Sequence, residues 1–393
     1  MKLSFINTIC PWAAFTVTVG AVLLSLSACR PDRRAGATAT ADALFQESDS
    51  ARLLVAEASD SVVIRYARGL AVGYEADGVH VRISNPEAPD AGAVELVVSG
   101  ASRRFICTTA LQLGNFEVLG LEPCIVGMNT LRNLFSTRMK AQMASGHTVC
   151  IGKEGNFDLE TVIAARPDYI FVSASKHGGF EALRDCGIPL IPHHGYKETD
   201  PLGQAEWVKL VGLLTGEVRL ANAVFADIER KYLALRDEVA RASGTDSAAA
   251  RRRPTIVSGR QMRDGWYVVG GRSYMARLFA DAGASYIMAG DDATGGRALD
   301  FESVYARGLH ADFWQIDGSY DGTFTLQTLA DEDPRYATMD AFRRRHVLFC
   351  NLAHTPYREL AGVQPHFLLA DFVRAIHPEL LPHYEPRYYR LLQ

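Results

Sequence analysis

The sequence predicts an α/β protein with two Rossmann-like lobes, joined by one long rigid helix and preceded by a small N-terminal β-meander. Three observations lead to this class. A short helix–strand unit occurs twice in the sequence, at residues 156–172 and 298–316. Apolar strand-like runs alternate with helical segments on both sides of the middle of the chain, which is typical of parallel α/β units. A single long amphipathic stripe separates the two sets.

The repeated unit has the same layout in both copies: a capped short helix, a break and an apolar strand. Both copies place an aspartate cap, an exposed acid in the first turn and a later aspartate at matching positions, which are Asp158, Glu160 and Asp168 in the first copy and Asp300, Glu302 and Asp312 in the second. A unit repeated on either side of the middle predicts two similar lobes with a cleft between them. An acid at the same place on each lobe predicts one partner that touches both.

The remaining organisation follows from composition and turn signals. Residues 46–100 are predicted as a β extension, with strands at 62–66, 70–74, 79–84 and 93–99. An N-terminal lobe is expected over 101–214, a connecting helix over 215–243 and a C-terminal lobe over 254–393. The helix carries an apolar stripe at helical spacing and would span about 40 Å. Such a connector is expected to limit closure of the lobes to a small hinge motion.

The 393 residues carry a formal net charge of −4 and 48% hydrophobic residues, an ordinary globular balance that is long enough for two domains. Neither sign of charge dominates, so no nucleic-acid partner is indicated. Residues 1–28 read as a secretory signal, and small residues just before Cys29 resemble a bacterial lipobox. We therefore expect lipidation of Cys29, and membrane attachment through that lipid anchor only.

Residues 29–45 are small, polar and basic, and predict a flexible stalk. No later stretch approaches the roughly 18 apolar residues of a membrane span. Of the seven cysteines, five remain beyond Cys10 and Cys29, and their spacing fits neither Cys-x-x-Cys nor a zinc pattern. Buried free thiols are the preferred interpretation, with one or two disulfides left open by the exported setting; the five are Cys107, Cys124, Cys150, Cys186 and Cys350.

Several motifs together resemble one family. They are Asn156–Glu160 before Arg166–Asp168, Asp200–Trp207 followed by Leu213–Glu217, Gly265–Tyr267 before Gly270–Met275, and Ala370–Phe372 before His377–Leu380. The chain resembles a substrate-binding lipoprotein of an ABC importer, of the periplasmic-binding class that takes iron-siderophores, haem or cobalamin. The resemblance covers about residues 101–390, and the 46–100 segment departs from it. It implies export, anchoring on the periplasmic side of a membrane, and a monomer.

The resemblance also implies a docking surface. In this family one surface acid on each lobe docks against basic residues of a permease dimer, which works with its ATPase. The matching positions are Glu160 and Glu302. Two separated carboxylates facing arginine pockets would give orientation and steering as well as affinity. A glutamate in a first helical turn also favours the helix dipole; that explains either residue alone, but it explains the matched pair less well.

The ligand is expected among loops beyond the carboxyl ends of the parallel strands. Trp266 and Tyr267 follow a glycine and are candidates for stacking on a planar ligand. Arginines suit an anionic chelate, because guanidinium matches carboxylate and phenolate geometry. The remaining candidates are loop histidine and tyrosine side chains; the full set is Trp266, Tyr267, Arg260, Arg263, Arg297, His177, Tyr196 and Tyr357.

The metal question stays open in the sequence. His177, His193, His194 and His354 fall in cleft-side loops, but no third ligand stands at a recognisable spacing. No Gly-x-Ser-x-Gly, phosphate-binding glycine loop or His-Glu-x-x-His is present, so a binding protein without an intrinsic cofactor is predicted rather than an enzyme. The expected ligand is an iron chelate such as a ferric siderophore. The alternatives are haem or cobalamin and, in another class, a secreted metallochelatase or hydrolase.

Overall fold

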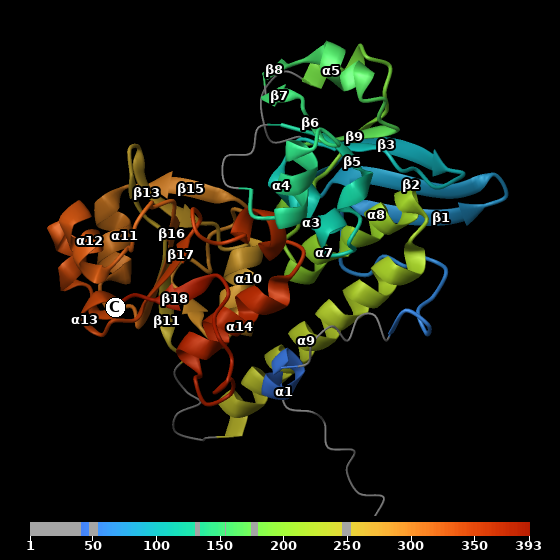
Figure 1. Cartoon of the computed structure of the whole chain (residues 1–393). Coiled ribbons are helices and arrows are strands. Elements are labelled where there is room, and N and C mark those ends of the chain that lie inside the picture. Colours follow the sequence, from blue (N-terminus) through green and yellow to red (C-terminus); the bar gives the residue numbers. More distant parts are fainter. Residues whose placement is uncertain (1–40, 47–53, 130–133, 154, 174–179, 246–252) are drawn as a thin grey trace, which may run out of the picture. The chain divides into compact units, whose positions relative to one another are not determined.

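The computed structural model describes residues 41–46, 54–129, 134–153, 155–173, 180–245 and 253–393. The predicted signal peptide at 1–28, Cys29 and most of the predicted stalk lie outside these ranges, as does His177. Within the described ranges, no helix combines the length and the hydropathy that crossing a membrane requires. Figure 1 shows the order of the helices and strands along the chain.

The N-terminal lobe is built on a five-stranded sheet with the order β10-β9-β4-β5-β6, in which every neighbouring pair is parallel. Its central strands are apolar and fully buried, as expected where helices cover both faces of a parallel sheet. The strands are β4 (Phe105–Cys107), β5 (Ile125–Met128), β6 (Val149–Cys150), β9 (Tyr169–Val172) and β10 (Leu190–Pro192).

The C-terminal lobe has a second five-stranded sheet with the order β14-β11-β16-β17-β18, in which only β18 is antiparallel. Its strands are β11 (Thr255–Ser258), β14 (Ser285–Tyr286), β16 (Phe313–Gly318), β17 (Val347–Asn351) and β18 (Tyr389–Leu391). Without one edge strand in each sheet, the order β5-β4-β9-β10 matches β14-β11-β16-β17 strand for strand. The two lobes therefore share one topology, as the repeat predicted.

The later aspartates of the repeat have the same structural role in both lobes. The Asp168 carboxylate accepts the backbone N–H groups of Arg103 at 2.9 Å and Arg104 at 3.0 Å, directly before β4. The Asp312 carboxylate accepts the N–H of Thr255 at 2.9 Å, at the start of β11. Each aspartate thus binds the amino end of the first strand of its own lobe. The repeat is a structural duplication and not a chance match of residues.

The helices of the repeated unit and the long connecting helix are present where the sequence predicts them. Asp158 and Asp300 cap α5 and α11 by accepting the N–H groups of Thr161 and Ser303. The long helix expected between the two sets is α9, which begins three residues after its predicted start. The others are α3 (Ala110–Glu117), α4 (Thr137–Ala144), α5 (Leu159–Ala164), α6 (Phe180–Arg184), α7 (Pro201–Glu206), α8 (Val208–Thr215), α9 (Val218–Thr245), α10 (Tyr274–Asp281), α11 (Phe301–Gly308), α12 (Leu326–Glu332), α13 (Asp340–Arg343) and α14 (Pro365–Ile376).

The N-terminal extension forms the predicted antiparallel meander, but with three strands instead of four. These are β1 (Leu70–Glu75), β2 (Gly78–Asn85) and β3 (Ala88–Val98). The strand predicted at 62–66 is wrong, because the N–H groups of Arg65, Tyr66 and Ala67 are donated to the Glu206 carboxylate and not to a neighbouring strand. A second buried carboxylate, Glu198, accepts the N–H groups of Arg68 and Gly69. The extension is therefore bonded tightly to the N-terminal lobe.

Two further predictions require correction. The segment 260–267, expected to be a loop, is a hairpin of β12 (Arg260–Met262) and β13 (Gly265–Val269) that continues to β15 (Gly296–Leu299). The end of the predicted flexible stalk is helical, in α1 (Ala41–Gln46), and lies against α9 and α14 (Figure 1). Phe45 of α1 packs edge-on against Phe367 and Tyr384, so apolar contact fixes this end of the stalk.

All five cysteines of the described chain are free thiols, but they differ in exposure. Cys107, Cys124 and Cys350 are buried, as predicted, and desolvation raises the pKa of each of these thiols. Cys186 is partly buried. Cys150 is exposed at the end of the edge strand β6, so the prediction of burial is wrong for this residue.

Candidate functional site

Segments that follow the parallel strands of the two lobes contact each other, and this contact joins the N-terminal lobe to the C-terminal lobe. Helix α3 follows β4 and packs against η5, a π-helical turn (Tyr357–Ala361) that follows β17. The buried Glu359 carboxylate of η5 crosses to the N-terminal lobe. It accepts the N–H groups of Phe135 at 2.6 Å and Ser136 at 3.1 Å, at the start of α4. The segments that follow β5 and β17, one in each lobe, are thus directly hydrogen-bonded to each other.

This contact between the lobes is close-packed at the backbone. A Cβ atom placed on Gly114 of α3 would lie 1.8 Å from the carbonyl oxygen of Glu359. The side chain of Glu117, on the same helix, faces Glu359 as well. Desolvation, and then the negative charges of Glu359 and Glu122, raise the pKa of Glu117 to about 7. The contact therefore depends on a glycine and holds a carboxyl group that is easily protonated.

Asp317 is a candidate residue that was not singled out from the sequence. It stands near the carboxyl end of β16, and its side chain is exposed. Desolvation nevertheless raises its pKa, against the opposing effect of the positive charges of Arg260 and Arg358. Asp317 follows the apolar run Phe313–Ile316, so the rule that places ligands beyond strand ends would have found it.

Tyrosines surround the same region. The Tyr274 and Tyr357 hydroxyls lie 3.2 Å apart, and the Tyr357 ring meets Tyr388 and Tyr389 edge-on. Tyr320, two residues beyond β16, is 40% exposed. The predicted Tyr357 is thus part of a tyrosine cluster that the sequence did not reveal, because its members come from segments far apart in the chain.

The prediction for Trp266 is wrong. Its side chain is 0% exposed, and its indole N–H donates to the carbonyl of Ser258. The ring packs on Phe301, Trp314 and Tyr336 in the core of the C-terminal lobe. Side chains alternate along β13, so burial of Trp266 exposes its neighbour. Tyr267 is accordingly 49% exposed and keeps its place as a candidate.

The predicted arginines are spread over the hairpin sheet of the C-terminal lobe. Arg260 pairs with Glu332, and Arg297 pairs with Asp291 at 2.9 Å. Arg263 is exposed, and no carboxylate of the described chain lies within ion-pair distance of it. Arg358, not singled out from the sequence, is exposed next to the tyrosine cluster and acts on Asp317. Tyr196, in the N-terminal lobe, lies in a 3-10 turn, η2 (Gly195–Lys197), and is partly buried.

His193 and His194 are buried and do not present free imidazoles to a ligand. Burial lowers the pKa of His193 to about 3 and that of His194 to about 4. The His193 ring packs on Trp207, and its Nε2 lies 3.3 Å from the amide nitrogen of Asn115. His354 is exposed. The expectation that the histidine pair faces the cleft is therefore wrong.

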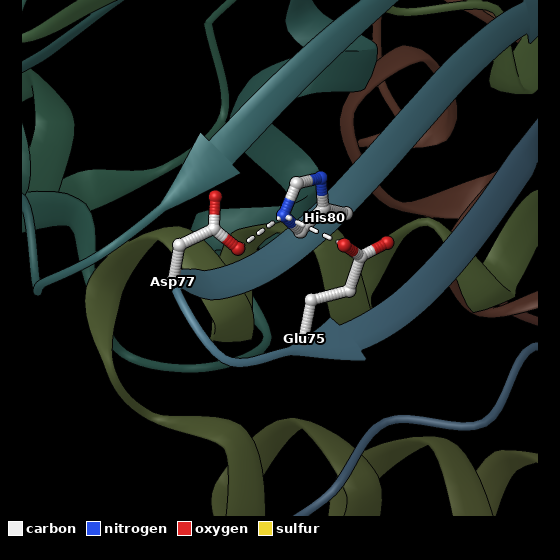
Figure 2. Close-up of side chains that lie close together, drawn as sticks. All are labelled: Glu75, Asp77 and His80. Atoms are coloured by element: carbon white, nitrogen blue, oxygen red, sulfur yellow. Dashed lines mark hydrogen bonds and ion pairs between the residues drawn. The ribbon is translucent and has the colours of Figure 1, made fainter.

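Figure 2 shows three side chains on the β1–β2 hairpin, Glu75, Asp77 and His80, that lie close enough to share a metal ion. His80 Nε2 is 2.7 Å from Asp77 and 3.8 Å from Glu75. Its hydrogen bond to Asp77 raises the pKa of His80. That shift favours the imidazolium, whereas a metal ligand must be neutral. In the structure the three side chains form a hydrogen-bonded cluster on the surface of the hairpin.

The two docking candidates occupy equivalent places in the two lobes. Glu160 in α5 and Glu302 in α11 both lie in the first helical turn after the capping aspartate, and both are exposed. The Glu302 side chain is 80% exposed and pairs loosely with Arg335 at 3.5 Å. Arg335 also lies over the ring of Phe301, which holds it beside the helix start.

The sequence and the fold identify the family. A model of the family described as periplasmic binding protein matches residues 106–351. The chain belongs to this family. Its members and the solved relatives below are binding proteins for transport and not enzymes.

Similar proteins confirm the fold. A periplasmic haem-binding protein from Pseudomonas aeruginosa has a TM-score of 0.53 at 19% identity, over 70% of this chain and 93% of that one. The Fe³⁺-hydroxamate ABC transport protein from Saccharomonospora viridis has a TM-score of 0.56 at 15% identity, over 75% and 98%. At these identities the likeness concerns the fold alone.

One sequence relative is named as a lipoprotein. The uncharacterized lipoprotein MJ0878 of Methanocaldococcus jannaschii is 25% identical over 240 residues, which are 60% of this chain. The match spans 54% of that relative, so this chain corresponds to about half of its length.

Proposed function

We propose that this chain is the lipid-anchored substrate-binding component of an ABC importer, which holds an iron chelate between its lobes and delivers it to a permease. The observation that carries the proposal is the duplication. Two lobes of one topology present Glu160 and Glu302 at equivalent exposed positions, and their ligand-side loops meet at α3 and η5. One protein then offers a two-point contact for a dimeric permease and a binding region between its lobes.

The ligand-side chemistry favours a planar or aromatic anionic chelate. Arg260, Arg263, Arg297 and Arg358 supply positive charge, and guanidinium groups suit carboxylate, phenolate and hydroxamate oxygens. Tyr267 and Tyr320 supply exposed aromatic faces. A ferric siderophore fits this combination. Haem and cobalamin are the alternatives, and the solved relatives named for haem and for Fe³⁺-hydroxamate make both iron ligands natural first tests.

Export and anchoring belong to the same proposal. The signal peptide over 1–28 and lipidation at Cys29 would place the chain on the periplasmic side of a membrane, and the family name and the lipoprotein relative support this placement. A monomer docking on a permease dimer with its ATPase is the expected assembly. Helix α9, 28 residues long, would keep the distance between the two docking acids nearly constant during transport.

Replacing both docking glutamates, Glu160→Ala/Glu302→Ala, is expected to leave chelate binding unchanged and to reduce uptake by about tenfold or more. Hydrogen bonds to charged groups contribute about 1.5–3 kcal/mol each, and both acids are exposed, with Glu302 in only a 3.5 Å contact with Arg335. Uptake of a radioactive iron chelate by vesicles with the reconstituted permease measures the loss. The control Glu57→Ala/Glu385→Ala removes the same charge from two other exposed positions. Full uptake by the docking variant would rule out this docking role.

A further inference from the structure

A pocket lined by arginines lies where the N-terminal extension and a loop of the N-terminal lobe meet the C-terminal lobe. Its volume is about 580 Å³. Arg68, just before β1, and Thr199, just before α7, line it from one side. Arg272, just before α10, and Ala276, Arg277 and Ala280 of α10 line it from the other. The pocket is distinct from the region around Asp317 and the tyrosine cluster, because none of those residues lines it.

Small side chains give this pocket its depth. Ala276 and Ala280 stand one turn apart on α10 and line the pocket together with Ala284. Long side chains at these positions would fill the space. The walls are polar and strongly basic, since four arginines line the pocket (Arg68, Arg253, Arg272 and Arg277) against a single carboxylate, Asp292.

The positive charge of the pocket is only partly neutralised within the protein. Arg272 pairs with Asp292 at 2.6 Å, and both side chains are well exposed. Arg277 pairs with Asp281, which also accepts the hydroxyl of Tyr232. Neither Arg68 nor Arg253 has an ion-pair partner in the described part of the chain, although the Arg68 charge acts on the buried Glu198 carboxylate. Four guanidinium groups around one cavity repel one another, and an anion between them would relieve that repulsion.

We infer that this pocket binds a small phosphate-bearing polyanion. Guanidinium groups are planar donors that can bind two phosphate oxygens at once. A wall with few carboxylates provides few ligands for a cation. The volume suits a ligand of a few heavy groups and excludes a folded partner. A free oligophosphate and the phosphate of a lipid headgroup share this chemistry. The inference stands whether or not the chain binds an iron chelate.

An anion here would also connect the lobes. Arg68 belongs to the segment that Glu198 bonds to the N-terminal lobe, whereas Arg272 belongs to the C-terminal lobe. The rim of the pocket already carries one such connection. Glu87 of the meander accepts hydrogen bonds from Lys197 of the N-terminal lobe at 2.8 Å and from Thr294, a lining residue of the C-terminal lobe, at 2.5 Å. The bound anion would add a second bridge beside it.

Calorimetric titration of the full chain with inorganic pyrophosphate tests the inference. We expect one site that weakens as salt is added, and Arg68→Gln/Arg272→Gln should weaken binding by about tenfold or more, since each loses charged hydrogen bonds. Arg82→Gln, which removes one charge from an exposed pair on the meander, should bind like the unchanged protein. The side chains of Arg68 and Arg272 bond no buried group, so these variants are expected to fold.

A gain of affinity gives a result that misfolding cannot imitate. Asp292→Asn removes the carboxylate that competes for Arg272, so pyrophosphate should bind several-fold more tightly. Co-sedimentation with vesicles of phosphatidylglycerol, compared with phosphatidylcholine, separates the two sources of phosphate. Binding to anionic vesicles that needs Arg68 and Arg272, without binding of pyrophosphate, would identify a headgroup as the ligand. Absence of both, or equal weakening in Arg82→Gln, would overturn the inference.

Discussion

Replacing Glu206 with alanine is expected to lower the free energy of unfolding by about 4 kcal/mol or more. The carboxylate is 0% exposed. It accepts the N–H groups of Arg65, Tyr66 and Ala67, and the Lys209 ammonium at 2.7 Å. Alanine would leave three backbone donors without an acceptor and a buried cation without its counter-ion. Urea unfolding followed by circular dichroism measures the change.

Three comparisons make the Glu206 result specific. Glu206→Gln keeps the shape and one acceptor oxygen, so it should lose less stability than alanine. Glu160→Ala removes an exposed glutamate and should stay within about 0.5 kcal/mol of the unchanged chain. Limited proteolysis should cut the segment before β1 faster in Glu206→Ala, because that segment loses its bonds to α7. An unfolding midpoint equal to that of Glu160→Ala would show that the carboxylate does not hold the extension.

The second large effect is expected at the contact between the lobes. In Gly114→Ala the new Cβ would lie 1.8 Å from the carbonyl oxygen of Glu359 and 2.9 Å from its carbon. Both atoms are backbone, so no rotamer change relieves the overlap, and α3 must move away from η5. The bonds from Phe135 and Ser136 to the Glu359 carboxylate would lengthen with this movement. We expect a loss of about 2–3 kcal/mol of stability and a weaker chelate site.

Gly73→Ala is the matched control for this change. Position 73 lies in β1, and a Cβ atom there meets nothing within 4 Å. The same methyl group should therefore leave both stability and ligand affinity unchanged. Hydrogen exchange adds a local measurement: the amides at the start of α4 should lose protection in Gly114→Ala only. If Gly114→Ala keeps full protection there, the lobes do not rely on this close approach.

The duplicated architecture was predictable because it rests on local signals. Aspartate caps, apolar strands and the break between them are short-range patterns, and Asp158 and Asp300 act as predicted. The long amphipathic stripe gave α9 in the same way. Such signals need no knowledge of what packs against them.

The wrong predictions for residues 62–66 and Trp266 have one cause: both depend on contacts with residues far away in the sequence. The run 62–66 looks like a strand, but its donors bond to Glu206, some 140 residues later in the chain. Trp266 follows a glycine, which suggested an exposed loop, yet its ring packs on Phe301, Trp314 and Tyr336 in the core of the lobe. The tyrosine cluster brings together residues from distant segments of the C-terminal lobe, and the contact of Gly114 with η5 joins the two lobes. No local sequence pattern predicts either contact.

Equilibrium dialysis of the mature chain against a ferric hydroxamate, haemin and cyanocobalamin, read from the absorbance of each chelate, tests the proposed function most directly. We predict that an iron chelate is retained at one per chain with a dissociation constant in the micromolar range or below, equivalent to about 8 kcal/mol or more. Gly114→Ala should weaken this retention, and Gly73→Ala should not. Free passage of all three chelates through the membrane, with the chain folded, would contradict the proposed function.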